Sequence, residues 1–189
     1  MKSFEYENYD SYIRAQIAGN IQNQNGVWVT KNSIQIIVEY IKNNQKEILL
    51  GICHGVRTGY EVSLFKEAFP TAKIIGTEIS PNAANFINVI QWDFHKVKEE
   101  WKNNIDFIYS NALDHSYNPR ECIDGWMSCV KKDGLCFIEW SWQHAVEPNE
   151  RDPFGASLEE YRKLFSEKHI AKCELEADLK RVIFVIAHR

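Results

Sequence analysis

The segment of residues 47–78 constrains the fold more than any other part of the sequence. It contains, in order, an apolar run, a glycine-rich turn, an amphipathic helix, a second apolar run and an acid, which is typical of open α/β sheets that bind a nucleotide-like cofactor. Gly51, Gly55 and Gly59 allow tight turns and a close approach of the backbone to a ligand. Glu78 follows the last glycine by about twenty residues, where an acid accepts both hydroxyls of a ribose. The segment therefore predicts a cofactor-dependent enzyme.

Length and composition limit the classes of protein and partner. With 189 residues, 44% of them hydrophobic, the sequence predicts one domain, in which residues 1–46 form a helical cap or lid. A net charge of -4 gives no overall attraction to nucleic acid, so a small-molecule partner is expected. The five cysteines form no C-x-x-C pair and are expected to be reduced thiols. No apolar run approaches the roughly 20 residues of a membrane span, and no signal segment opens the chain, which favours a cytoplasmic protein without membrane contact.

Short apolar strands alternate with helices after residue 47, which predicts an α/β fold with a doubly wound, mostly parallel sheet and helices on both faces. Near the C-terminus two strands are separated by a short turn, and a turn of this length permits only antiparallel pairing. The expected seven strands are residues 47–52, 73–79, 89–92, 105–111, 135–140, 170–177 and 181–188. Helices are expected at 9–18 and 33–41, with a loop or lid at 19–30.

Three pairs of residues have the spacing of a capping box, in which a side chain at the start of a helix and an acid three positions later exchange hydrogen bonds with the backbone. They are Thr58 with Glu61, Asn118 with Glu121, and Ser157 with Glu160. Each pair predicts the beginning of a helix after one of the expected strands or loops.

The chain from about residue 47 to the end resembles the class I S-adenosylmethionine-dependent methyltransferases, whose sheet also ends in an antiparallel hairpin. GICHGVRTGYE looks like a variant of their glycine-rich first motif, with Cys53-His54 replacing the usual residues, and QWDF resembles the third-strand motif that contacts adenine. The resemblance implies S-adenosylmethionine as the cofactor and S-adenosylhomocysteine as its product. It implies these cofactor-binding residues: Gly51, Cys53, His54, Gly55, Gly59, Glu78, Ile79, Asp93, Phe94 and Asn111.

Methyl transfer to a hydroxyl requires alignment of the acceptor and removal of its proton, a task that suits histidine. His115 follows the strand at 105–111 and is the expected base, with His144 next and Asp114 as a third catalytic residue. A histidine just past a strand also often only bonds a loop. The segment 141–156 has no periodicity and is expected to be an active-site loop. The expected substrate contacts are Glu139, Trp142 and Asp152.

The same region carries side chains of the kind that bind metal ions. Asp114, His115, Glu139 and His144 carry oxygen and imidazole ligands that can converge between two strand ends. Their spacing matches no specific metal motif, so the sequence predicts no required metal.

The leading prediction is a small-molecule methyltransferase that acts on a hydroxyl of a sugar, a nucleotide-linked intermediate or a phosphate-type metabolite, because the 141–156 loop is polar. A weak similarity to methyltransferases of bacterial surface-polysaccharide pathways favours the same acceptors. Two alternatives stay open. A nicotinamide-dependent oxidoreductase uses the same glycine turn and distal acid, although this sequence has no G-x-G-x-x-G. A non-catalytic binding subunit can keep the fold without the activity.

Overall fold

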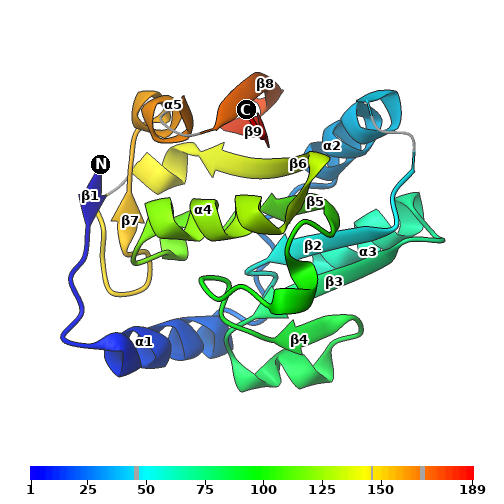
Figure 1. Cartoon of the computed structure of the whole chain (residues 1–189). Helices are drawn as coiled ribbons and strands as arrows, with labels where there is room; N and C mark the ends of the chain where they lie inside the picture. Colours follow the sequence, from blue (N-terminus) through cyan, green and yellow to red (C-terminus); the bar gives the residue numbers. More distant parts are fainter. Residues whose placement is uncertain (45–46, 146, 167–168) are drawn as a thin grey trace.

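The computed structural model describes residues 1–44, 47–145, 147–166 and 169–189. Its main feature is a seven-stranded sheet with the order β4-β3-β2-β5-β6-β9-β8 (Figure 1). Neighbours from β4 to β6 are parallel, whereas β9 is antiparallel to both β6 and β8. The strands are β2 (Leu50–His54), β3 (Lys73–Glu78), β4 (Val89–Gln91), β5 (Ile105–Ser110), β6 (Val130–Ser141), β8 (Ile170–Asp178) and β9 (Arg181–Ala187). The predicted fold class, including the terminal hairpin, is confirmed.

The central strands are apolar because both faces of a parallel sheet are covered by helices. All six residues of β5 are buried. The helices α2 (Lys31–Asn44) and α3 (Tyr60–Ala68) pack in one core cluster, and α4 (Pro119–Cys129) and α5 (Leu158–Ser166) pack in the other. Helices therefore cover both faces, as predicted.

Two of the three predicted caps are confirmed. The side chain of Asn118 accepts a bond from the backbone N–H of Glu121 at 3.4 Å, and Ser157 exchanges bonds with Glu160. The prediction for Thr58 and Glu61 is wrong, because α3 begins one residue later, after Gly59, which makes no side-chain cap bond. Gly59 has a φ of 79°, a left-handed conformation that glycine adopts without steric cost.

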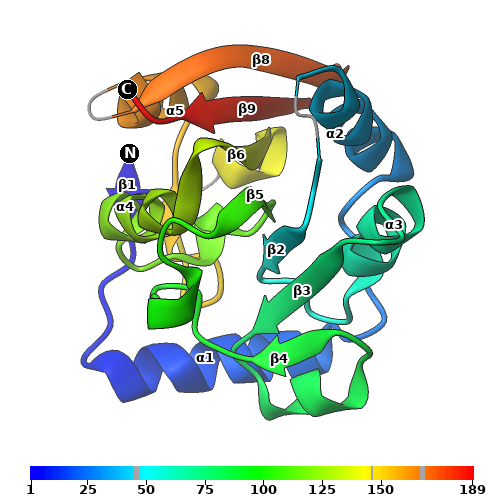
Figure 2. The ribbon, with the colours of Figure 1, turned by 45° about the vertical axis from the view of Figure 1, so that its right-hand side comes forward.

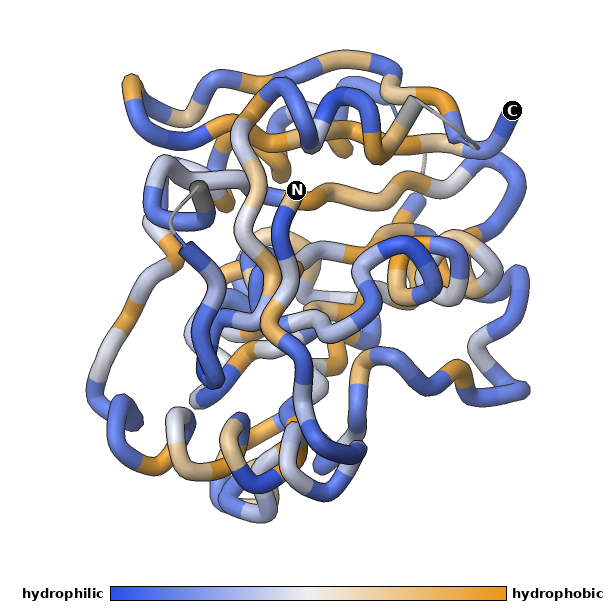
Figure 3. Tube along the Cα trace, turned by 90° about the vertical axis from the view of Figure 1, so that its left-hand side faces the viewer, coloured by the Kyte–Doolittle hydropathy of each residue, from blue (hydrophilic) through white to orange (hydrophobic). Residues whose placement is uncertain are grey.

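The first 22 residues lie outside the two helical layers, whereas α2 belongs to one of them. Helix α1 (Tyr9–Gln22) lies near the bottom of Figure 2, below β3 and level with β4. The short strand β1 (Lys2–Ser3) pairs antiparallel with β7 (Phe154–Gly155), so the first residues run beside the segment leading out of the predicted active-site loop (Figure 3). Within the described residues, no helix combines the length and apolar character needed to span a bilayer.

The strand order defines where a ligand binds. From β2 the chain adds β3 and β4 on one side and then β5 and β6 on the other, so the order reverses between β2 and β5. In open α/β sheets, ligands bind outside the carboxyl ends of the strands at such a switch point. His54 and Ser110 are the last residues of these two strands and are paired in register.

Candidate active site

A cavity of about 540 Å³ lies at this switch point. Its volume is within the range of roughly 300–1,000 Å³ that is typical of small-molecule sites. Its walls come from the glycine turn after β2, the end of β3, the loop after β4, the short helix η3 (Leu113–His115) after β5, and the 142–152 region. Residues of α1 and of the 23–29 loop form the remaining side. The expected loop at 141–156 therefore does reach the cavity.

The glycine turn is held close to the neighbouring strands. The backbone N–H groups of Gly55 and Val56 donate to the carbonyl of Thr77 at 2.9 and 3.1 Å. Gly55 has a φ of 73°, and a Cβ there would lie 2.5 Å from the Cβ of Ala112. Both the backbone conformation and the space therefore require glycine. The next residue but one, Arg57, also has a positive φ, of 51°.

Glu78 joins the turn to the end of β3. Its carboxylate accepts the backbone N–H of Arg57 at 3.0 Å and that of Ser80 at 2.9 Å. A carboxylate has about four acceptor positions, so two bonds leave acceptor capacity on the cavity side. Glu78 is buried and lines the cavity, which fits an acid that receives hydroxyl groups of a ligand.

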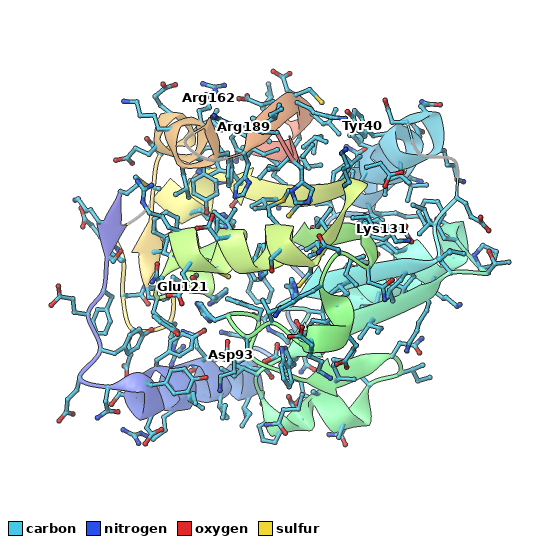
Figure 4. All side chains as sticks on the ribbon, in the orientation of Figure 1. Tyr40, Asp93, Glu121, Lys131, Arg162 and Arg189 are labelled. Atoms are coloured by element: carbon cyan, nitrogen blue, oxygen red, sulfur yellow. The ribbon has the colours of Figure 1, made fainter. Side chains whose placement is uncertain are left out.

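Asp93, in the loop after β4, is engaged on both oxygens. One accepts the backbone N–H and Nδ1 of His95 at 2.9 and 2.8 Å, and the other accepts the hydroxyl of Tyr9. Burial acts against the charged form, but these hydrogen bonds outweigh it and lower the pKa of Asp93. Asp93 thus fastens α1 to the loop that also carries Phe94, and Figure 4 shows it directly above α1.

Four polar side chains gather where η3 faces the 142–152 region: Asp114, His115, His144 and Asp152. The Nε2 of His144 lies 3.5 Å from Oδ2 of Asp114, and Nδ1 of His115 lies 3.7 Å from Oδ1 of Asp152. The backbone N–H of Ser141 donates to Nδ1 of His144 at 3.4 Å, so the neutral ring carries its proton on Nε2, facing Asp114.

His115 has the opposite tautomer. Its Nδ1 lies 2.8 Å from the carbonyl of Arg151 and 3.1 Å from Oε1 of Gln16, both acceptors, so the proton is on Nδ1 and Nε2 keeps its lone pair. Burial lowers the pKa of His115, but the carboxylates of Asp114 and Asp152 outweigh it, and the pKa is raised.

Glu61 is a buried acid in the cavity wall. It lies in the first turn of α3 and is only 4% exposed. Burial raises the pKa of Glu61 to about 8, and the charge of Arg57 offsets this in part. A carboxyl group that is protonated near neutral pH is unusual and is found preferentially in functional sites.

No protein-family model matches the sequence, and no curated protein matches it significantly. Solved structures do share its fold. The plantazolicin methyltransferase BpumL in complex with a triazolic desmethylPZN analog and SAH superposes with a TM-score of 0.71 at 15% identity, covering 95% of this chain and 96% of that one. The chain has a Rossmann-like methyltransferase fold.

Two further structures have the same methyltransferase fold. The Burkholderia thailandensis 1,6-didemethyltoxoflavin-N1-methyltransferase, with bound 1,6-didemethyltoxoflavin and S-adenosylhomocysteine, gives a TM-score of 0.71 at 10% identity and covers 97% of this chain and 92% of that one. An S-adenosylmethionine-dependent methyltransferase from Clostridium acetobutylicum gives 0.69 at 8% identity, covering 90% and 97%.

Most predicted site residues do line the cavity. They are Gly55, Glu78, Ile79, Asp93, Phe94, Asn111, Asp114, His115, Trp142, His144 and Asp152. Gly59 ends the turn that forms the wall and precedes α3. Trp142 is 51% exposed and lies at the rim, where Lys180 is 5.4 Å from its ring.

Five predicted site residues are not among those that line the cavity: Gly51, Cys53, His54, Gly59 and Glu139. Gly51, Cys53 and His54 belong to β2, which extends two residues beyond the predicted end. The side chains of Cys53 and His54 are buried within the packed sheet. A Cβ at Gly51 would overlap the ring of Phe107. The three residues therefore lie outside the cavity lining, and their contact with a cofactor stays a prediction.

His54 and Glu139 have structural partners instead. His54 bonds Thr77 at 2.8 Å through Nδ1 and stacks on Trp126 at 4.9 Å, and burial lowers its pKa to about 3. Glu139, predicted as a substrate contact, accepts the hydroxyl of Tyr109 at 3.1 Å and pairs with Arg181 at 3.3 Å. Both side chains are buried, and neither lines the cavity.

Several residues that line the cavity were not predicted from the sequence. Arg57 stacks on Trp28 at 4.2 Å and donates to the carbonyl of Gly26 at 3.3 Å, which connects the glycine turn to the N-terminal loop. Gln16 and Glu61 also line the cavity. The position of Arg57 inside the glycine turn was the only available sign, since the others depend on how α1 and α3 pack.

Proposed function

We propose that the chain is an S-adenosylmethionine-dependent methyltransferase that transfers a methyl group to a small polar acceptor. One observation carries the proposal. Glu78 is hydrogen-bonded to the glycine turn through the backbone N–H of Arg57, at the switch point of a methyltransferase fold. This arrangement leaves carboxylate acceptor positions facing a cavity large enough for a nucleoside and a second molecule. The ribose hydroxyls would be bound by Glu78, and the adenine would lie towards Asp93 and Phe94.

The acceptor would occupy the part of the cavity between η3 and the 142–152 region. S-adenosylmethionine, when bound, would supply the methyl group to the acceptor oxygen by in-line displacement, with the carbon–sulfur bonding pair staying on sulfur. The hydroxyl proton passes to a base. His115 suits this role because its Nε2 keeps a lone pair, while His144 holds Asp114 in place.

The acceptor class follows from the polarity of this end of the cavity. Two carboxylates and two imidazoles suit a hydroxyl-bearing sugar, nucleotide-linked or phosphate-type metabolite of the kind methylated in surface-polysaccharide synthesis, and not a lipid. Structures with the same fold hold 1,6-didemethyltoxoflavin or a desmethylPZN analog together with the cofactor product, which supports a small acceptor here.

Calorimetric titration tests the proposal. The protein should bind S-adenosylhomocysteine at one site per chain and should not bind NAD. Glu78→Gln should weaken that binding by about 10–100-fold, because a hydrogen bond to a charged group contributes about 1.5–3 kcal/mol. Glu67→Gln, an exposed acid on α3, is the matched control and should bind like the wild type. Binding of NAD instead, or equal affinity in Glu78→Gln that still folds, would contradict the proposal.

A further inference from the structure

The acceptor end of the cavity contains a convergent set of ligand atoms of the kind that holds a metal ion. One ligand atom from each of Asp114, His115 and Asp152 lies within 4.8 Å of the others. A divalent cation about 2.1 Å from each ligand atom needs them roughly 3 Å apart, so the side chains, including the His115 ring, would turn to complete the set. The three residues come from two segments that are distant in sequence, η3 and the loop before β7.

A second observation concerns Asp114. This residue is only 9% exposed and lines the cavity. Its Oδ2 faces Nε2 of His144 at 3.5 Å, whereas its buried Oδ1 has no hydrogen-bond partner among the described residues. An unpaired buried carboxylate oxygen costs free energy, so such a group indicates a missing partner.

The other two side chains are also held so that one ligand atom stays available. Asp152 accepts the side-chain N–H of Asn149 on Oδ2 at 3.2 Å, which leaves Oδ1, 3.7 Å from Nδ1 of His115, without a hydrogen bond from Asn149. His115 donates its Nδ1 proton to the carbonyl of Arg151, so Nε2 carries the lone pair. Metal-binding histidines typically donate their other nitrogen to a carbonyl or carboxylate in this way.

The loop that carries Asp152 is fixed rather than free to drift from η3. The backbone N–H groups of Arg151 and Asp152 donate to the side chain of Asn149 at 2.8 and 3.1 Å. Gln16 of α1 donates to the carbonyl of Arg151 at 3.0 Å. The pairing of β1 with β7 holds the end of the same loop.

The geometry points to a divalent cation site formed by Asp114, His115 and Asp152 at the acceptor end of the cavity. Two carboxylates and one imidazole suit Mn²⁺ or Zn²⁺ better than Ca²⁺, which prefers oxygen ligands alone. Arg57 interacts electrostatically with both carboxylates, but no ion pair joins them among the described side chains, because its guanidinium stacks on Trp28. Arg57 therefore does not neutralise either carboxylate through a direct ion pair.

The chemical role of this site rests on the proposed function, although cation binding itself does not. An acceptor hydroxyl bound to the cation would lose its proton more readily, as metal-bound water does. The hydroxyl proton would pass to water. His115 would then bind the cation and would not act as the base. The cation thereby replaces one element of the mechanism above without changing the methyl transfer.

Titration with Mn²⁺ tests the inference. Chelator-treated, dialysed protein is titrated with MnCl₂ while electron paramagnetic resonance reports the free ion. The loss of the free-ion signal should correspond to one bound Mn²⁺ per chain. Asp114→Asn and Asp152→Asn should each weaken binding by at least about 10–100-fold, the loss that even outer-shell partners of a metal cause. Glu150→Gln is the matched control, since Glu150 is an exposed acid of the same loop that does not line the cavity, and it should bind like the wild type.

The outcomes separate this inference from the proposed function. No saturable binding up to about 1 mM Mn²⁺, the weak end of oxygen-ligand sites, would overturn the cation site. Equal affinity in Asp152→Asn and the wild type would overturn it as well, and a thermal melt of each variant identifies loss of fold. Binding of S-adenosylhomocysteine without Mn²⁺ would remove the cation site alone, whereas the reverse result would retain it and remove the methyltransferase.

Discussion

The substitution Glu61→Gln tests whether the buried acid in the cavity wall has a raised pKa. Burial raises the pKa of Glu61 to about 8 from its ordinary value of 4.5. The folded protein therefore binds this proton more tightly than the unfolded chain does. This proton contributes to the free energy of unfolding. The contribution is fully present below the pKa that Glu61 has in the unfolded chain, and it is lost as the pH rises towards the pKa of Glu61 in the folded protein.

The magnitude follows from linkage. One proton held only by the folded state changes the free energy of unfolding by about 1.4 kcal/mol per pH unit. Glutamine has nearly the same shape as protonated glutamate and does not titrate. From pH 5 to pH 7, the free energy of unfolding of Glu61→Gln should therefore rise relative to the wild type by about 2–3 kcal/mol.

Urea unfolding at pH 5, 6 and 7 measures this difference for the two proteins. Glu67→Gln, on the exposed side of the same helix, is the control and should show no such slope against the wild type. Parallel pH dependences of Glu61→Gln and the wild type would refute the reasoning, because they would mean that Glu61 is ionised in the folded protein at pH 5.

Two further substitutions separate packing from the site. Gly51→Ala should lower the free energy of unfolding by about 1–3 kcal/mol, because its Cβ overlaps the buried ring of Phe107, with unchanged S-adenosylhomocysteine affinity in the folded protein; a loss of affinity would return Gly51 to the cofactor site. Gln16→Ala removes the bonds to Arg151 and His115 and should weaken Mn²⁺ binding by about 10-fold while leaving S-adenosylhomocysteine binding intact; equal Mn²⁺ affinity would show that α1 does not position the ligands.

Much of the fold was predictable because its signals are local or follow from the sheet. Apolar strands alternating with helices specify a parallel sheet, and the short turn after Asp178 specifies the antiparallel hairpin. The strand-end rule then brought Glu78, Asp114 and His115 to one cavity before any geometry was known.

The errors have physical causes. The apolar run does not reveal that β2 continues through Cys53 to His54, and each residue added to a strand places its side chain on one of the two covered faces. The surroundings of Glu139 also could not be predicted from a local pattern. They depend on the pairing of β6 with β9, which brings Arg181 next to Glu139. The contributions of Gln16 and Glu61 depend on how α1 and α3 pack, which no local pattern encodes.

The most direct test of the central claim is a crystal structure of the protein with S-adenosylhomocysteine. The account predicts the ligand in the cavity between β2 and β5, with its ribose hydroxyls within hydrogen-bond distance of Glu78, its adenine beside Phe94, and its sulfur directed towards Asp114 and His115. A ligand bound elsewhere, or one whose ribose does not contact Glu78, would contradict the assignment of this cavity as the methyl-donor site.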